Sequence, residues 1–367
     1  MFDRKLVGQF DWLLLMLVVC ISLIGFVSIY SASLNYAEVF PYYLKQPIWF
    51  ALGLVVLFLI ILFDYRLFCG FSFLFYLILI ALLIAVLWYG TGGPGSRVNR
   101  WIAIGPLFLQ PSEFAKFALV LYLANYFNDS RRINNLRLVD IVWPLCVTLI
   151  PFVLILNQPD LGTASVLLIA AISIIFLVGL RMKAILITGI GSLVSLPIIW
   201  FFILKSYQRD RILAMFDPES DPLGKGYQII QSKIAIGSGK LWGKGFLEGT
   251  QAKLNFLPAR HTDFIFSIFT EEWGFVGGIT LIGLYVLLIV RCLYYVGKTK
   301  DRSGTVLVVG VTSIFAAHII INVGMVLGLF PIVGMPLPFM SYGGSAMISN
   351  MVGVGLILNV GMRRQQN

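Results

Sequence analysis

Charged side chains are scarce in this sequence. Only 12% of its 367 residues are Asp, Glu, Lys or Arg, whereas 59% are hydrophobic. A soluble domain carries about 25% charged residues, so the deficit excludes an ordinary soluble protein. The apolar runs are long enough to cross a bilayer. Because backbone polar groups must be satisfied internally within the membrane, the sequence predicts an all-α polytopic membrane protein.

Motifs for metal, disulfide and nucleotide chemistry are also missing. The four cysteines lie in or beside apolar runs at no metal-like spacing, which indicates packing rather than disulfides or metal ligands. The glycine-rich stretches GSGK (237–240) and GKG (243–245) lack the glycine spacing of a phosphate-binding loop and its Ser or Thr after the lysine. The sequence therefore indicates no nucleotide site, and any metal ligands stay unassigned.

Ten transmembrane helices are predicted. Their expected limits are 12–32, 45–63, 68–90, 111–128, 140–157, 162–180, 183–204, 264–296, 304–329 and 345–361. No internal repeat divides them, so residues 1–367 are interpreted as a single membrane domain. A polar segment, 205–263, joins the seventh and eighth helices and is too long for a simple hairpin loop.

Lysine and arginine set the predicted orientation, because short cytoplasmic segments carry an excess of them. With the N-terminus inside, the short inner segments hold 14 of the 27 basic residues and the short outer segments hold four. Both termini are therefore predicted to be cytoplasmic, and the 205–263 segment to be extracytoplasmic. This topology explains the net charge of +10, so no nucleic-acid partner is expected.

The end of the polar segment carries the leading candidate for chemistry. Asp263 lies where polar sequence gives way to an apolar run, and His261 is close enough in sequence to tune it. Partial burial raises the pKa of a carboxyl group toward a range that suits a general base. The alternative is a helix cap, because Thr262 or Asp263 would open the next helix. The residues alone leave both interpretations open.

Other ionisable residues lie near the outer ends of predicted helices. Glu113 and Lys116 are three residues apart and share a helical face, which favours either a structural ion pair or a place in the site. Asp160 begins the sixth helix, where a cap is the favoured interpretation. His318 and Asn322 share a face of the ninth helix and are expected to hydrogen-bond between helices.

The outer surface also offers cations for an anionic substrate. Arg209 and Arg211 lie near the start of the polar segment, and Lys240 and Lys244 follow in its glycine-rich stretches. Such a surface either binds a pyrophosphate through charge and backbone N–H groups or only attracts anionic lipid headgroups. The spacing of apolar residues in this segment predicts a helix over 227–234 that lies on the membrane surface.

Residues 330–345 are apolar but rich in proline and glycine, so they cannot form a continuous helix. Irregular backbone at membrane depth is tolerated where protein buries it or where it lines a wet cavity. We therefore expect this segment, which includes Ser341, to lie at the site.

Four motifs resemble those of the SEDS proteins (shape, elongation, division and sporulation). They are RHTDFIF (260–266) followed by EEWG (271–274), PLPFMSYGGS (336–345), QPSEFAK (110–116) and QPDLGT (158–163). The similarity extends along the whole chain. The short N-terminus and the overall length resemble the rod-shape branch of the family more than its division branch.

The resemblance implies a peptidoglycan glycosyltransferase that polymerises lipid II during cell-wall elongation, at the outer face of the cytoplasmic membrane. It also implies a class B penicillin-binding protein as transpeptidase partner, further elongation-complex proteins, and a divalent cation such as Mg²⁺ or Mn²⁺. The essential aspartate of the family corresponds to Asp263. Family members also depend on the residues that correspond to Trp101, Glu113 and Lys116.

The expected reaction is an inverting glycosyl transfer. Asp263 takes the proton from the 4-hydroxyl of an acceptor GlcNAc, and that oxygen attacks C1 of the donor MurNAc and expels undecaprenyl pyrophosphate. No second acid is needed, because pyrophosphate is already a good leaving group that requires cations instead. The expected cations are Lys116, Arg209 and Arg211, with Lys240 and Lys244 as weaker candidates.

Two alternatives come from other classes of protein. A lipid II flippase would also have many helices and intramembrane charges, but its essential polar residues should extend through the full membrane depth. The candidates in this sequence cluster at the outer face, which favours chemistry. A non-catalytic scaffold for the transpeptidase would instead tolerate substitution of Asp263.

Overall fold

The computed structural model describes residues 8–33, 41–92, 99–105, 107–128, 136, 138–221 and 224–364. Within these ranges, eight helices are long and apolar enough to cross a membrane. They are α2 (Trp12–Ser33), α3 (Tyr42–Leu62), α5 (Ser72–Tyr89), α7 (Leu138–Asn157), α8 (Leu161–Val178), α13 (Ile265–Tyr294), α14 (Arg302–Val326) and α15 (Gly344–Arg363). The prediction of a helical, multi-pass membrane protein is confirmed.

Shorter helices occupy two of the predicted spans. α6 (Pro111–Tyr126) has 16 residues, and α9 (Met182–Ile198) has 17 before it continues into the π-helix η2 (Ile199–Ile203). Pro197 precedes η2 and lacks the N–H group that an α-helix would use there. A short helix, α4 (Tyr65–Gly70), precedes α5, so the third predicted span is a broken helix.

The polar segment is mostly helical. It contains α10 (Ser206–Phe216), the 3₁₀ turn η3 (Pro218–Ser220), α11 (Lys225–Ser238) and the short α12 (Thr250–Lys253). The helix predicted over 227–234 is part of α11.

A small antiparallel sheet corrects the all-α prediction. β1 (Thr91–Gly92), β2 (Asn99–Ile104) and β3 (Leu107–Leu109) pair in that order, with Ile102 opposite Leu109. The segment 91–110 is rich in glycine and proline, which favour turns. The run WIAI in β2, however, has the aromatic and β-branched residues that suit a pleated surface.

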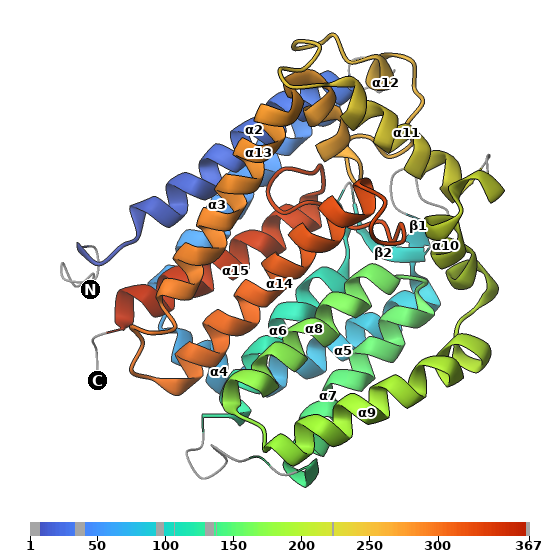
Figure 1. Cartoon of the computed structure of the whole chain (residues 1–367). Coiled ribbons are helices and arrows are strands. Elements are labelled where there is room, and N and C mark those ends of the chain that lie inside the picture. The colour runs from blue at the N-terminus through green and yellow to red at the C-terminus, as the bar shows by residue number, and fades with distance from the viewer. Residues whose placement is uncertain are drawn as a thin grey trace.

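The two termini and the short helix α4 lie at one end of the helix bundle, and the strands and α10–α12 lie at the opposite end (Figure 1). We call the opposite end the loop end; it comprises β1–β3, α10–α12 and residues 327–343. α6, α8, α13 and α15 begin at the loop end, which brings the N-terminal turns of four helices together.

α14 and α15 form the centre of the bundle. In their spans, 61% and 83% of the residues are buried, against 22% in α3 and in α5. Small residues allow this close packing: a Cβ on Gly353 would lie 2.6 Å from the ring of Phe117 and 2.9 Å from that of Phe315. Small residues at helix contacts are the usual means by which membrane helices approach each other.

α13 bends at Gly274, whose φ of 67° and ψ of −165° are essentially restricted to glycine. Two N–H groups freed by the bend find other partners. Phe275 N donates to Lys240 O over 2.8 Å, and Val276 N donates to Leu241 O over 3.1 Å. The glycine-rich stretch of the polar segment therefore packs directly against the bend. A Cβ on Gly274 would lie 2.3 Å from the backbone nitrogen of Gly243.

Replacing Gly274 by alanine is expected to lower the free energy of unfolding by about 3 kcal/mol, because strained backbone and collision with Gly243 combine. Gly283 is the matched control on the same helix, where a new Cβ meets no atom within 4 Å. Gly283→Ala should be neutral or should stabilise the helix by up to about 1 kcal/mol. Thermal unfolding in one detergent compares the two variants, and equal melting temperatures would contradict this account of the bend.

Candidate active site

Asp263 lies in the turn that leads into α13, at the loop end. Its side chain is half-buried, and its N–H donates to Ala259 O over 3.0 Å. The N-cap of α13 is Phe264, and no side chain caps this helix. The helix-cap alternative for Asp263 is therefore wrong, because the cap position falls one residue later, at Phe264.

The irregular segment 327–343 holds the turn that carries Asp263. Asn322, near the end of α14, donates through Nδ2 to Asp263 O over 2.9 Å and to Met335 O over 2.6 Å. Gly334 lies beside the carboxylate: its φ is +72°, and a Cβ there would lie 3.2 Å from Asp263 Oδ2. A side chain at position 334 would crowd the carboxylate, so glycine leaves space beside Asp263.

Ser341 and His261 join the same two segments. Ser341 donates through Oγ to Thr262 O over 2.6 Å and accepts from Leu337 N over 2.8 Å. The His261 ring stacks on Tyr42, with centroids 4.3 Å apart and planes 13° apart. These contacts fix the two residues that precede Asp263, so Ser341 and His261 both act on its position.

A basic group lies at the start of α8. Arg100 of β2 donates through Nε to Gln158 O over 2.9 Å, and its Nη1 lies 3.9 Å from Asp160 Oδ1. Asp160 accepts from Thr163 N over 3.2 Å and is only 2% exposed, so its predicted role as a helix cap is confirmed. Arg100 was not among the predicted site residues, and only its position beside Trp101 pointed to it.

Arg211 connects this basic group with Asp263. It lies on α10 and is half-buried. Burial and then the charge of Arg100 lower the pKa of Arg211, while Asp160 and Asp263 oppose that shift. The guanidinium is thus within electrostatic reach of both carboxylates. A cationic side chain thus lies within electrostatic reach of a half-buried carboxylate, a combination that suits an anionic leaving group and a base.

Arg209 and Trp101, two further candidates at the loop end, make other contacts. Arg209 is half-buried and donates through Nη2 to Phe201 O over 3.0 Å, which ties α10 to η2. Trp101 is half-buried on β2 and pairs with Thr91 of β1.

Lys116 and Glu113 form a buried ion pair one turn below the loop end. Lys116 Nζ lies 3.0 Å from Glu113 Oε2 and 2.8 Å from His318 Nε2, and the two charged side chains are 0% and 3% exposed. Ser349 donates to the same carboxylate oxygen over 3.2 Å. His318 also contacts Pro336 O through Nδ1 over 3.2 Å. The structure therefore buries Lys116 and connects it, through His318, with the irregular segment.

Lys244 and Lys240 lie against the bend of α13. Lys244 Nζ contacts the buried Glu271 carboxylate over 2.6 Å and donates to Thr250 Oγ1 over 2.9 Å. Lys240 is exposed, with a φ of +49°. The structure brings Asp263, His261, Ser341, Arg211 and Asp160 together, whereas the two lysines belong to the packing of the polar segment on α13.

Comparisons with known proteins match this chain over most of its length. A family model described as a cell cycle protein, covering FtsW, RodA and SpoVE, matches residues 11–366. Peptidoglycan glycosyltransferase MrdB of Escherichia coli is 42% identical over 315 residues, or 86% of this chain and 84% of that protein.

Two solved structures have similar folds. A chain from a peptidoglycan synthase complex, studied for the coordination of polymerization and crosslinking, superposes with a TM-score of 0.82 at 35% identity. It covers 98% of this chain and 99% of that chain. The rod shape determining protein RodA of Thermus thermophilus has a TM-score of 0.72 at 32% identity, covering 98% of each chain.

Proposed function

The chain belongs to the cell cycle protein family that includes FtsW, RodA and SpoVE, and on this premise we propose that it is a peptidoglycan glycosyltransferase of cell-wall elongation. The placement of Asp263 is the main support. Its side chain is half-buried, its backbone accepts a hydrogen bond from Asn322 of α14, and its carboxylate lies within electrostatic reach of Arg211. Glycosyl transfer from a lipid pyrophosphate needs a base at the attacking hydroxyl and cations at the leaving group.

In the proposed mechanism, Asp263 accepts the proton of the GlcNAc 4-hydroxyl as its oxygen attacks C1 of the donor MurNAc. The C1–O bond to pyrophosphate breaks, and the configuration at C1 inverts. Arg211 and Arg100 stabilise the negative charge of the departing undecaprenyl pyrophosphate. Lys116, buried beside Glu113, supports the irregular segment rather than touching the substrate.

A divalent cation is the proposed cofactor. Among the described residues, no three His, Cys, Asp or Glu side chains are grouped to hold a metal ion, so a cage built by this part of the protein alone does not fit. Mg²⁺ is commonly held by one or two carboxylates together with substrate phosphates. Glu113 and Asp160 do not suit that arrangement, because both are buried and already bonded, so the metal ligands on this chain stay unassigned. The bound cation would neutralise charge on the pyrophosphate.

The proposed topology has ten spans in one domain, 1–367, with α6 and the continuous α9–η2 completing the eight longer helices. Both termini would be cytoplasmic, and the loop end, with the 205–263 segment, would face the periplasm or cell exterior. Lipid II would be the substrate. A class B penicillin-binding protein would be the transpeptidase partner within the elongation complex, which the similarity to a chain of a peptidoglycan synthase complex supports.

To test this function, the protein is purified together with its transpeptidase partner and incubated with lipid II and Mg²⁺ or Mn²⁺. The expected result is glycan polymer, separated by length on a gel. A parallel assay follows fluorescent lipid II across vesicles that contain the protein. Movement of lipid II without polymer would favour a flippase. Neither activity, under conditions where a known polymerase works, would favour a scaffold.

Replacement of Asn322 by leucine is expected to reduce kcat about 10–100-fold with little change in KM, because small displacements of a catalytic group have effects of this size. The change keeps the approximate volume but removes both hydrogen bonds that join Asp263 to Met335. Ser313→Ala is the control on the same helix, where the hydroxyl bonds only to Gly310 O over 2.7 Å. Steady-state kinetics would contradict the positioning role if both variants kept wild-type kcat.

A further inference from the structure

A small cavity with two basic side chains lies at the end of the bundle that holds the termini, opposite the loop end (Figure 1). It is lined by the last turn of α8, the first turns of α14 and the residue that precedes its N-cap: Leu177, Val178, Lys300, Arg302, Thr305 and Val306. Arg302 and His318 are 16 residues apart on α14, or about 24 Å along the helix. The cavity is therefore remote from the candidate active site, and the proposed reaction uses none of its side chains.

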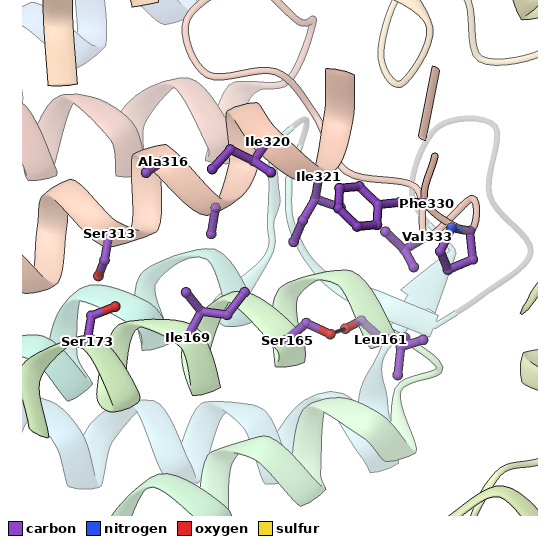
Figure 2. A pocket seen from close by; sticks show the side chains of 12 residues that line it. Leu161, Ser165, Ile169, Ser173, Ser313, Ala316, Ile320, Ile321, Phe330 and Val333 are labelled. Atoms are coloured by element: carbon purple, nitrogen blue, oxygen red, sulfur yellow. Dashed lines mark hydrogen bonds between the residues drawn. The ribbon is translucent and has the colours of Figure 1, made fainter. Parts of the chain in front are cut away.

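Positive charge distinguishes this cavity from the apolar pocket nearer the loop end. None of the 12 side chains that Figure 2 draws around that pocket carries a charge. Here, Lys300 and Arg302 bring two positive charges to the lining. In the part of the chain that the structure describes, neither side chain forms an ion pair with a carboxylate. Both charges are therefore available to an anion that is not part of this region.

Asp301 lies between the two cations in the sequence but is bonded elsewhere. Its Oδ2 accepts from Tyr65 Oη over 2.7 Å and lies 3.9 Å from Arg66 Nε, so the carboxylate joins α14 to α4. The same oxygen caps α14 by accepting from Gly304 N over 3.4 Å. The acidic residue closest in sequence is thus engaged by α4 and by the helix cap, and it does not pair with the cations of the cavity.

The rest of the lining is mostly aliphatic. Val178 and Val306 are each 1% exposed, whereas Leu177 is 39% exposed. Leu177 belongs to the last turn of a membrane span that ends at Val178, so its exposed part lies at the edge of the hydrocarbon layer. The span of α14 begins at Arg302. The two cations therefore lie near the level where hydrocarbon ends and lipid phosphate groups begin.

Cations beside an aliphatic wall at this level fit an amphiphile with an anionic head group. Basic pockets between membrane helices on the cytoplasmic side are a known means of binding such head groups. A soluble phosphate would contact the cations but leave the aliphatic wall unused. The lipid pyrophosphate of the proposed reaction has a separate set of cations, Arg100 and Arg211, at the loop end.

We propose that this cavity binds the phosphate of an anionic phospholipid, such as phosphatidylglycerol, in the cytoplasmic leaflet. Lys300 and Arg302 contact the phosphate, and Leu177 contacts the first carbons of an acyl chain. The bound lipid joins the end of α8 to the beginning of α14. The choice of leaflet rests on the proposed topology, whereas the site itself requires no catalysis.

Native mass spectrometry of the full-length protein in detergent micelles tests the site by titration with phosphatidylglycerol. For Lys300→Gln/Arg302→Gln we expect Kd to rise about thirtyfold, the effect of two cations near a lipid phosphate. Lys183→Gln/Lys298→Gln is the control, because it removes the same charge from two exposed lysines at the same end, outside the cavity. Its Kd should change less than about threefold, since salt screens charges that do not contact the ligand. Equal changes in the two double variants would overturn the proposal.

Other ligands in the same titration identify the occupant. Phosphatidylcholine, which has a phosphate but no net charge, should bind about tenfold more weakly than phosphatidylglycerol. Equal binding of the two lipids would overturn the proposal. Displacement of phosphatidylglycerol by inorganic phosphate would identify a site for a soluble anion. Undecaprenyl pyrophosphate bound more tightly than phosphatidylglycerol, and lost from Lys300→Gln/Arg302→Gln, would identify a substrate site, and either result would also overturn the proposal.

Photolabelling locates the lipid without any variant. The full-length protein in vesicles is irradiated with phosphatidylglycerol that carries a diazirine near its phosphate, and labelled peptides are identified by mass spectrometry. We expect labels on residues 177–178 and 300–306 that excess unlabelled phosphatidylglycerol removes. Labels confined to other segments would overturn the proposal. Neither measurement requires turnover, so polymer formation by the wild type tests the proposed function separately.

Discussion

Lys116→Met is expected to lower the free energy of unfolding by about 3–5 kcal/mol, because it leaves a buried carboxylate without its cation. Glu113 and Lys116 are 3% and 0% exposed and 3.0 Å apart. His318 depends on the same ammonium, 2.8 Å from its Nε2, and contacts the irregular segment through Pro336 O. The loss should therefore also loosen the backbone near Asp263, and thermal unfolding measures it.

An exposed ion pair of similar length provides the control. Lys253 and Glu248 are 3.2 Å apart, with side chains 51% and 67% exposed. Lys253→Met should cost at most about 1 kcal/mol, because solvent screens such pairs. The double variant Lys116→Met/Glu113→Leu should recover much of the lost stability, since no unpaired charge remains. Equal melting temperatures for Lys116→Met and Lys253→Met would contradict the buried-pair account.

Most of the helix order could be predicted because hydrophobic runs of bilayer length have few other structural solutions. The exceptions have local causes. The sheet of β1–β3 was missed because turn-forming residues surround the three strand-forming residues of β2, Trp101, Ile102 and Ile104. The bend in α13 at Gly274 depends on contact with the chain at Gly243, and no hydropathy pattern records such a contact.

The residues of the candidate site were partly predictable. Asp160 proved to be a helix cap, as its position predicted, but the same argument failed for Asp263 because α13 is capped one residue later, at Phe264. Glu113 and Lys116 were expected either to form a structural ion pair or to lie in the site, and the structure shows the buried pair. The bonds of Asn322 to Asp263 O connect residues 59 positions apart, so only the folded structure could reveal them.

Asp263→Asn is expected to reduce polymerisation by about 10²–10⁴-fold, the usual contribution of a general base. Asparagine has nearly the same shape, so the bonds of the Asp263 backbone with Asn322 and Ala259 should remain. Asp210→Asn is the matched control, because Asp210 is exposed on α10 at the same end of the molecule. The control should keep wild-type activity.

The most direct measurement is glycan length on a gel, from lipid II and a divalent cation, for wild type, Asp263→Asn and Asp210→Asn. Thermal unfolding confirms beforehand that all three proteins are folded. Long polymer from the wild type and from Asp210→Asn, with none from folded Asp263→Asn, is the predicted result. Polymer of wild-type length and amount from Asp263→Asn would contradict the assignment of Asp263 as the base.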